Sequence, residues 1–508
     1  MRGIRLGWVL CLFACKGGEL ELGTLEDTAS TASSASSTTV PAYPEANSEH
    51  GGFAPGVTIG KISAYQVMET KLANNGNAPS NTQIPLVNER DALVRVFLEP
   101  SKISPLEVYG ELTLERNGEV ETLQRTKTLR QESTNEKIGS TMNFDVPGAW
   151  IGPGLSMDLQ LFDAALDGGG GLEEDATWSS ETTGGVPTER SGSLEIVLIP
   201  IRYNADGSGR TPDTSEAQIQ RYRDTLYAMY PVTDITIRVT DVSDWSGAIE
   251  ASGAGWGELL NAVSNARTSN SEAPNTYYYA VFEPADSMYE YCQWGCVAGL
   301  SYLANRPNDV WARASMGLGF SGQGSADTMV HEVGHAHGRE HAPCGVDDVD
   351  RNYPHAGGVT NVWGYHQLLE VLHAPDEADM MSYCSPIWIS DYTYLYLFDR
   401  VRDLEGVGQY APGPVAWQSF SVDQTGGGSV LTGALPSVGE PGGEAVLVQR
   451  FDSRGVPIDV VTGHVFPYSH IPGGRVLVPG ADDLGSVRLL DPAPVSRHAI
   501  LKQPYKMR

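Results

Sequence analysis

His331-Glu332-Val333-Gly334-His335-Ala336-His337-Gly338-Arg339-Glu340-His341 has the form HExxHxxGxxH. On a helix, His331 and His335 lie four residues apart and project from one face, so that both imidazoles can reach one metal ion. Glu332 lies one residue further round, where a carboxylate can take a proton from a water that the metal activates. Gly338 can adopt a left-handed backbone, which lets the helix end and brings His341 back as a third ligand. The spacing predicts a catalytic site with one Zn²⁺.

The alternative is a solvated helix whose histidines bind nothing. HExxH arises by chance in about one chain in a hundred of this length, and the added Gly and His lower that to the order of a few in a hundred thousand. The complete motif therefore favours the metal site. His337 has the wrong spacing for a ligand, and we predict a bystander at the surface or behind the ligands.

A second segment, Asp379-Met380-Met381-Ser382-Tyr383-Cys384, follows the motif. With it, the sequence over roughly residues 190–410 resembles the metzincin clan of zinc endopeptidases, in which a tight turn places a Met beneath the metal. The resemblance implies that Met381 is this Met. The run Met381-Ser382-Tyr383 is similar to the Met-x-Tyr of the astacin and serralysin branches. It implies that Tyr383 is a fifth zinc ligand that swings away to stabilise the oxyanion; a packed core tyrosine is the alternative.

The chain has 508 residues, a length that predicts about three domains. Its net charge of −29 argues against nucleic acid or an anionic membrane surface as a partner. The composition leaves the oligomeric state open.

Residues 1–15 are predicted to be a signal peptide, because Arg2 and Arg5 precede an apolar run too short to span a bilayer. The run ends in Leu12-Phe13-Ala14-Cys15, which resembles a bacterial lipobox and makes Cys15 a candidate for lipidation; an ordinary secretory signal is the alternative. Either predicts export, and the lipobox predicts an outer-membrane or cell-surface lipoprotein whose only membrane contact is this anchor. Residues 16–51, rich in Ser, Thr and Ala, predict a flexible tether.

Four cysteines remain beyond the signal, and in an oxidising compartment they predict two disulfides. Cys344 with Cys384 would join the two walls of the active site, and Cys292 with Cys296 would close a small loop. A zinc site made of all four is the competitor, although the spacing lacks a CxxC pair.

The predicted fold is an α+β metzincin-like catalytic domain, with a twisted mixed sheet, a zinc helix, a Met-turn and a C-terminal helix, flanked by two β-sandwich-like domains. The sandwiches are predicted from short alternating runs separated by Pro, Gly and Asn. The N-terminal one is either accessory or inhibitory. The predicted boundaries are 52–167 for the first sandwich, 168–193 for a Gly/Ser/Glu-rich linker, 194–410 for the catalytic domain and 415–508 for the second sandwich.

Several local features refine the catalytic domain. Ser215 with Gln218 forms a capping box, and Ser325 is predicted to cap the zinc helix. Residues 311–318 are predicted to be the strand at the sheet edge on which substrate would lie extended, with an interior strand as the alternative. Ser390-Asp391 is expected to start the last helix.

Three aspartates, Asp347, Asp348 and Asp350, lie in the loop after the motif. They could hold Ca²⁺, but the Gly and distal Glu of an EF-hand are missing, and a solvated acidic loop is the favoured interpretation. His355, His366 and His373 have no ligand-like spacing and are interpreted as structural or surface residues.

We therefore expect an exported zinc endopeptidase that hydrolyses peptide bonds of extracellular proteins, with Glu332 as general base. The rival is a surface-binding or adhesin lipoprotein whose β-domains carry the function and whose zinc is structural. Zinc-dependent hydrolysis of a non-protein substrate is a third reading of the motif.

Overall fold

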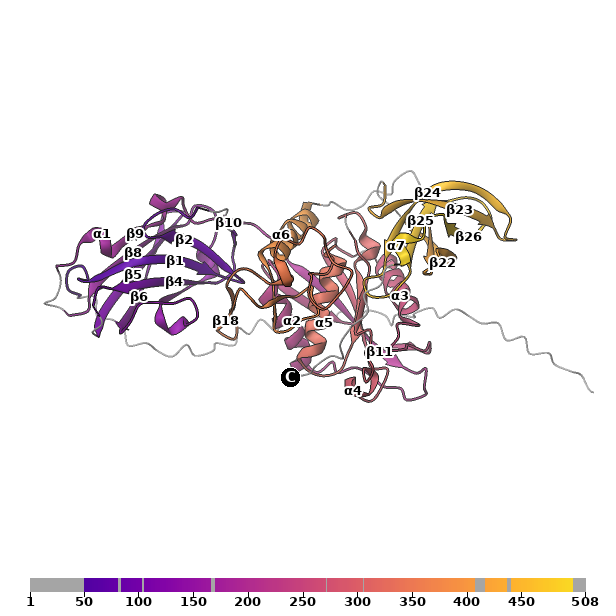
Figure 1. The fold of residues 1–508 in the computed structure, drawn as a ribbon, viewed down its shortest axis with the longest axis horizontal. Helices are drawn as coiled ribbons and strands as arrows, with labels where there is room; N and C mark the ends of the chain where they lie inside the picture. The colour runs from indigo at the N-terminus through magenta and orange to yellow at the C-terminus, as the bar shows by residue number, and fades with distance from the viewer. Residues whose placement is uncertain are drawn as a thin grey trace, which may run out of the picture.

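The computed structural model describes residues 50–80, 84–102, 105–165, 170–270, 272–304, 306–406, 416–435 and 440–496. The predicted signal peptide with Cys15, and the predicted tether as far as residue 49, lie outside the described residues. The described chain forms three bodies in a row (Figure 1). The middle one contains the domain predicted to be catalytic and is called the catalytic body here; it lies between an N-terminal sandwich and a C-terminal barrel. None of the helices in the described ranges is long and apolar enough to span a membrane.

The N-terminal body consists of two four-stranded antiparallel sheets that share one apolar core. Alternate residues of each strand face that core, as period-two patterning requires. One sheet has the order β2-β1-β4-β7 and the other β6-β5-β8-β9. The bounds are β1 (Val57–Tyr65), β2 (Glu69–Asn74), β4 (Ala92–Pro100), β5 (Leu106–Arg116), β6 (Glu119–Leu129), β7 (Met142–Val146), β8 (Ser156–Asp163) and β9 (Thr177–Ser179).

Residues 168–193 were predicted to be a linker, but the described part from residue 170 largely belongs to this sandwich, so that prediction was wrong. It contains α1 (Glu173–Ala176) and β9, which pairs with β8. Trp178 is only 7% exposed and packs in the sandwich core with Ala176. Two apolar side chains in a polar, Gly-rich run are enough to attach the segment. The chain then pairs as β10 (Thr188–Glu189) with β3 (Leu86–Val87) before it enters the catalytic body.

The catalytic body is built on a mixed sheet with the order β12-β11-β14-β16-β15, and β13 pairs with the end of β11. All pairs are parallel except the antiparallel pair β15 with β16. The central strands are buried on both faces, which explains their unbroken apolar runs. The bounds are β11 (Leu194–Tyr203), β12 (Ile235–Val239), β13 (Ser243–Trp245), β14 (Thr276–Phe282), β15 (Gly299–Ser301) and β16 (Ala314–Leu318).

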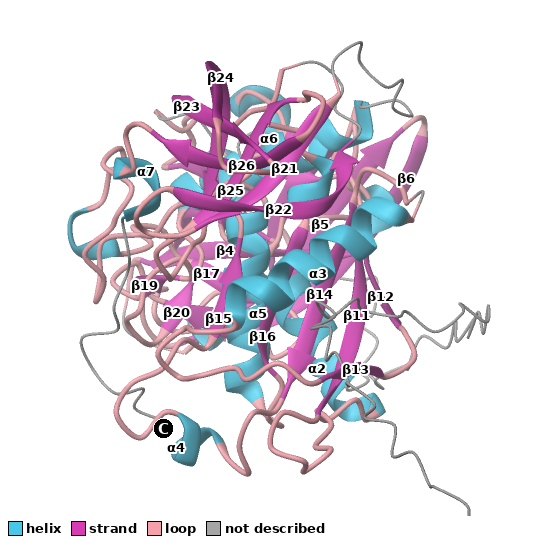
Figure 2. Cartoon of the chain, turned by 90° about the vertical axis from the view of Figure 1, so that its right-hand side faces the viewer, coloured by secondary structure: helices cyan, strands magenta, loops and turns pink. Residues whose placement is uncertain are grey.

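Helices cover both faces of this sheet. α2 (Glu216–Met229), α5 (Gln323–Ala336) and α6 (Asp391–Gly406) share one apolar core with the sheet, and α3 (Trp256–Ser269) packs in the core of the opposite face. α3 lies against β14 and β16 of the sheet (Figure 2). α6 follows Ser390, whose Oγ accepts a hydrogen bond from the Thr393 amide at 3.1 Å. The predicted start of this helix is thus confirmed.

Three local predictions need correction. The segment 311–318 contains β16, which is an interior strand; the edge is the three-residue strand β15. Ser325 does not cap α5, because the helix begins at Gln323 and the Ser325 hydroxyl donates to the Leu318 carbonyl. Only half of the capping box forms. Ser215 Oγ accepts from the Gln218 amide at 3.4 Å, whereas the Gln218 side chain bonds the Gly322 backbone.

The chain between α5 and α6 is mostly loop, with two small strand pairs. β17 (Gly364–His366) pairs with β18 (Val371–His373), and β19 (Ala378–Asp379) pairs with β20 (Ile387–Trp388). The second pair frames the segment 380–386, which passes beneath the end of α5.

The C-terminal body is a closed barrel, not the predicted sandwich. Alternating runs indicate strands but not whether a sheet closes on itself, and here β21 pairs with β25 to complete the ring β21-β22-β26-β23-β24-β25. The bounds are β21 (Trp417–Val422), β22 (Gly427–Leu435), β23 (Glu444–Asp452), β24 (Pro457–Pro467), β25 (Gly474–Pro479) and β26 (Leu484–Leu489). A short helix, α7 (Ala493–Ser496), follows.

Buried arginines attach both outer bodies to the catalytic one. Arg90 of the sandwich donates to the Tyr230 carbonyl after α2 at 2.7 Å. Arg475 of the barrel donates to Ser264 Oγ at 2.6 Å and to Asn265 Oδ1 at 2.9 Å, both on α3. The barrel contact holds the loop between β24 and β25, residues 468–473, against the catalytic body; we call it the barrel loop.

Candidate metal centre and active site

Helix α5 carries the first two predicted ligands, His331 and His335, on its buried face. The helix ends at Ala336, and Gly338 has a φ of +96°. A Cβ at Gly338 would lie 2.6 Å from the Ala304 carbonyl oxygen, so both the backbone angle and the space require glycine. The turn brings His341 back to the two helical histidines.

The three imidazoles converge through their Nε2 atoms. His335 Nε2 lies 3.0 Å from His331 Nε2 and 3.2 Å from His341 Nε2. Ligands at about 2.0–2.1 Å from a tetrahedral zinc are separated by about 3.3 Å, so the spacing is close to what a metal would impose.

Each ring is held by its other nitrogen. Nδ1 of His331, His335 and His341 bonds the backbone carbonyls of Met380, Arg339 and Asp348 at 2.8, 2.6 and 3.1 Å, respectively. A carbonyl can only accept, so Nδ1 carries the proton and Nε2 presents its lone pair to the centre. This arrangement fits a bound metal ion.

Burial keeps these rings neutral. It lowers the pKa of His331 to about 4, although the adjacent Glu332 carboxylate acts in the opposite direction. Burial likewise holds the pKa values of His335 and His341 well below the usual value, and the neighbouring histidines lower them further. Neutral imidazole is the form that binds metal.

The turn after β19 packs directly under the helix. A Cβ at Gly334 would lie 2.5 Å from Met381 Sδ, so the glycine leaves room for that sulfur beside the ligands. The turn itself is held by the buried carboxylate of Asp379, which accepts from the amides of Met381 at 2.7 Å and Ser390 at 2.9 Å. Sequence reasoning had not singled out Asp379.

Glu332 points away from the helix core toward the edge strand. Glu332 is only 2% exposed. Its carboxylate packs against Gly299 of β15, where an added Cβ would lie 2.4 Å from Glu332 Oε1, so the glycine leaves room for the carboxylate. The other oxygen, Oε2, accepts from the Ser469 hydroxyl of the barrel loop at 3.4 Å. The carboxylate thus lies beside the three imidazoles, between β15 and the barrel.

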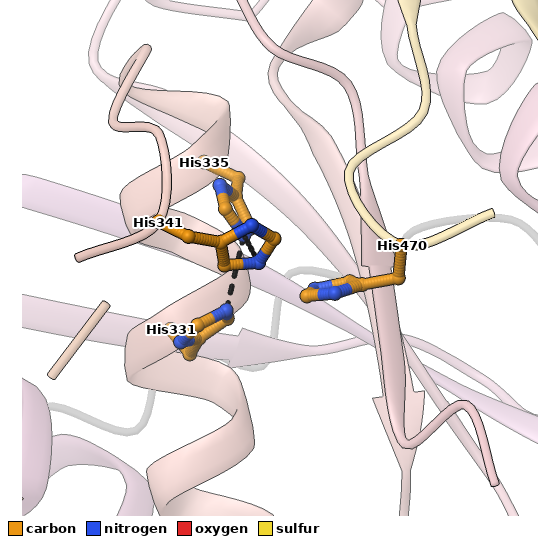
Figure 3. Close-up of side chains that lie close together, drawn as sticks. All are labelled: His331, His335, His341 and His470. Atoms are coloured by element: carbon orange, nitrogen blue, oxygen red, sulfur yellow. Dashed lines mark hydrogen bonds between the residues drawn. The ribbon is translucent and has the colours of Figure 1, made fainter. Parts of the chain in front are cut away.

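A fourth histidine, His470 of the barrel loop, faces the other three from the opposite side (Figure 3). One nitrogen from each of His331, His335, His341 and His470 lies within 4.8 Å of the others. His470 Nε2 lies 2.7 Å from Glu332 Oε1. No sequence signal pointed to His470, because it comes from another domain and shares no spacing with the motif.

Tyr383 also reaches the centre. Its ring centroid lies 5.2 Å from that of His341 and 5.9 Å from that of His331, and its hydroxyl bonds His470 Nδ1. Burial, and then the nearby Glu332 carboxylate, raise the pKa of Tyr383 well above its usual value, so the phenol stays protonated.

A cleft of about 530 Å³ opens beside His331 and Glu332. Its walls are the chain leading into β15, the side of α5, the turn around Tyr383 and the barrel loop. None of the described residues of the N-terminal sandwich lines this cleft. Of the two flanking bodies, it is therefore the barrel that shapes the site.

Both predicted disulfides are present, Cys344 with Cys384 and Cys292 with Cys296. This pairing overturns the competing zinc site of four cysteines. Cys384 follows Tyr383 directly and Cys296 lies in the chain leading into β15, and both line the cleft.

His337 and Asp350, which lie near the ligands, have protein partners. His337 is fully buried rather than at the surface, stacks on Tyr277 and bonds the Val333 carbonyl. Asp350 pairs with the buried Arg339 at 3.1 Å. Within the described ranges, His331, His335, His341 and His470 form the only group of three or more His, Cys, Asp or Glu side chains that could hold a metal ion. The possible Ca²⁺ site at Asp347, Asp348 and Asp350 therefore gains no support.

Residues 300–385 match the family model described as Peptidase M66. The chain is also similar to the protein named Dictomallein from Burkholderia pseudomallei (strain 1710b) and from Burkholderia mallei (strain SAVP1), with 24% identity to each over 281 residues. Each alignment covers 47% of this chain and 36% of the relative, so it spans about a third of the length of those proteins. Both similarities support a metallopeptidase.

A structural similarity to a calcium-binding mutant of Bacteroides uniformis beta-glucuronidase 2 has a TM-score of 0.15 and 9% identity, over 47% of this chain and 31% of the other. A score this low carries no argument about the fold.

Proposed function

We propose that this chain is a zinc-dependent endopeptidase that hydrolyses peptide bonds of extracellular proteins. The observation that carries the proposal is the convergence of three Nε2 atoms beside a buried carboxylate at the wall of a cleft. The match of residues 300–385 to Peptidase M66 supports it, since that range includes all three histidines, Glu332 and Tyr383.

His331, His335 and His341 would hold the zinc. When bound, the ion supplies Lewis acidity, which lowers the pKa of a water toward neutrality and polarises the scissile carbonyl. Glu332 takes the proton from the attacking water and delivers it to the leaving amine. Its position between Gly299 and the barrel loop fixes the carboxylate on the side of the imidazoles that faces the cleft.

Tyr383 stabilises the oxyanion in this proposal. Its phenol is protonated and lies beside His331 and His341, and one such donor is typically worth about 2.7–4 kcal/mol of transition-state stabilisation. In the structure this hydroxyl is in contact with His470 Nδ1, and His470 must move aside before the hydroxyl can reach substrate.

The cleft favours an extended peptide with an apolar side chain. Val297, Ile387 and Ile471 line it, and Trp294 at its rim is 91% exposed. The edge strand β15 lies along one wall, where main-chain hydrogen bonds from an added strand would hold substrate.

The deciding experiment is Glu332→Gln in the full chain, assayed against a mixed peptide library and for zinc content. The variant should retain the metal and lose hydrolysis by at least about a hundredfold, the lower range for general acid–base catalysis. Glu216→Gln, on the exposed surface of α2, is the matched control and should cleave normally. Full activity of Glu332→Gln would refute the proposal.

Export with a lipid anchor at Cys15 is a further part of the proposal. Two disulfides support an oxidising compartment. Metabolic labelling with a fatty acid should mark the wild-type chain and leave Cys15→Ala unmarked; equal labelling of both would refute the anchor.

The rival function is a surface-binding protein with a structural zinc. A structural site has no need of the carboxylate at position 332, which here faces the cleft beside the ligands. A non-protein substrate would show as hydrolysis of an ester or amide probe without cleavage of any peptide in the library.

A further inference from the structure

We propose that His470 is a fourth protein ligand of the metal, and that the barrel loop thereby closes the centre in the resting protein. This inference deepens the proposed zinc site. It concerns a residue 129 positions beyond His341, in another domain, and outside the range 300–385 that matches Peptidase M66.

The first observation is the position of the ring. The centroid of His470 lies 5.2, 5.0 and 4.9 Å from those of His331, His335 and His341, respectively. A ring almost equidistant from the other three lies near the axis of the tripod that they form (Figure 3). That axis leads to the fourth corner of a tetrahedron, the place that a catalytic zinc site keeps open.

The second observation is an unsatisfied atom. His470 is 8% exposed, and its Nε2 has no hydrogen-bond partner although it lies 2.7 Å from Glu332 Oε1. The two atoms approach without the alignment that a hydrogen bond requires. A cation bound by the three other imidazoles would give this buried nitrogen a partner and would draw the carboxylate toward the same point.

The third observation is the support of the ring. His470 Nδ1 bonds the Tyr383 hydroxyl, whose oxygen can accept the Nδ1 proton as the backbone carbonyls accept those of the motif histidines. Ligating histidines are typically oriented in this way by their second nitrogen. In this tautomer, which the proposal requires, Nε2 of His470 presents its lone pair to the metal.

The backbone of the barrel loop explains how the ring is delivered. The Ser469 amide donates to the Ser301 carbonyl at 3.0 Å, and the Ser301 amide donates to Ser469 Oγ at 3.0 Å. Tyr468 forms a bridge with Tyr302. The loop thus adds itself to the end of the edge strand β15, and the next residue presents its side chain to the metal. It occupies the place of an extended substrate.

The ends of the loop are firmly held, and only its tip need move. Tyr468 bonds Asn261 and Arg475 bonds Ser264, both on α3. Gly473, at the other end of the tip, has a φ of +110°. Withdrawal of His470 would open the fourth position, free the Glu332 carboxylate and release the Tyr383 hydroxyl in one movement. A single side chain therefore covers the fourth metal position and contacts both Glu332 and Tyr383.

The test uses the full chain loaded with Zn²⁺ or Co²⁺. X-ray absorption at the zinc edge of the wild-type protein should count four imidazole ligands; a count of three would overturn the proposal. This measurement needs no variant and no activity, so it stands even if Glu332→Gln shows that the chain is not a peptidase.

The variant His470→Ala is compared with His464→Ala, another buried histidine of the same barrel. Loss of a ligand should increase the release of zinc to a chelator by at least about tenfold. This is the smallest loss of metal affinity typical of mutating a residue that only hydrogen-bonds a ligand. The visible spectrum of the Co²⁺ form should change in His470→Ala and stay unchanged in His464→Ala. Peptide hydrolysis should rise in His470→Ala, because the fourth position is then open.

Two results with the variant His470→Ala would also overturn the proposal. One is a Co²⁺ spectrum and a zinc affinity that are the same in His470→Ala and wild type. The other is loss of hydrolysis with an unchanged spectrum, which would make His470 a positioning residue for Glu332 or Tyr383 instead.

Discussion

Removing the disulfide between Cys344 and Cys384 should loosen both walls of the active site. Cys344 lies three residues after His341, and Cys384 follows Tyr383. The bond closes a loop with a sequence separation of 40, whereas Cys292 and Cys296 are separated by 4. From the loss of chain entropy in the unfolded state, the long loop is worth about 4 kcal/mol and the short one about 2 kcal/mol.

The assay compares Cys344→Ala/Cys384→Ala with Cys292→Ala/Cys296→Ala as the matched control. Hydrogen exchange in peptides from α5 and β14, measured on the metal-free protein, reports the opening free energy of the catalytic body without interference from the other two bodies. The long-loop variant should lose about 2 kcal/mol more than the control. It should also bind zinc more weakly, because His341 lies only three residues before Cys344 and loses this restraint.

Equal losses in the two variants would refute the entropic reasoning. Unchanged zinc affinity in Cys344→Ala/Cys384→Ala would refute the assignment of this bond to the walls of the site.

Two further perturbations test the surroundings of the ligands. Asp350→Ala leaves the buried guanidinium of Arg339 unpaired, which should destabilise the catalytic body by about 3–5 kcal/mol. Because the Arg339 carbonyl orients His335, zinc affinity should also fall about 10–100-fold; a chelator titration checks this, and an unchanged affinity would contradict it. Acid should destabilise the metal-free protein, because burial lowers the pKa of His331 to about 4 and the folded state then binds fewer protons than the unfolded state. The stability of the folded state is unaffected by His331 above pH about 6.5 and falls by about 3 kcal/mol toward pH about 4. Hydrogen exchange at several pH values checks this, and stability that rises on acidification would contradict it.

The sequence predicted the parts of the site that depend on local geometry. His331 and His335 converge because four residues make about one helical turn, and Gly338 turns the chain because its backbone can be left-handed. The two disulfides followed from the compartment and from the positions of the cysteines beside the motif and the turn. The first two features depend only on residues close together in the sequence. The disulfides could be predicted because only four cysteines had to be paired.

The errors concern contacts that only the folded chain defines. The edge strand β15 has three residues and no pattern of its own, so the longer β16 looked like the edge until its partner was seen. The barrel differs from a sandwich only in which strands pair. His470 is placed by the docking of Arg475 and Tyr468 on α3, and neither its spacing nor its neighbours in sequence carry that information.

The motif histidines and Glu332 belong to one domain, whereas one wall of the cleft belongs to another. This division affects how such a protein can diversify. Exchange of Ile471 and Pro472, which line the cleft from the barrel loop, would alter what fits there while leaving His470 and the histidine motif in place. Substrate selectivity could then change while the residues that carry the chemistry stay the same. Mutations that change which target this protein selects are accordingly expected at the tip of the barrel loop.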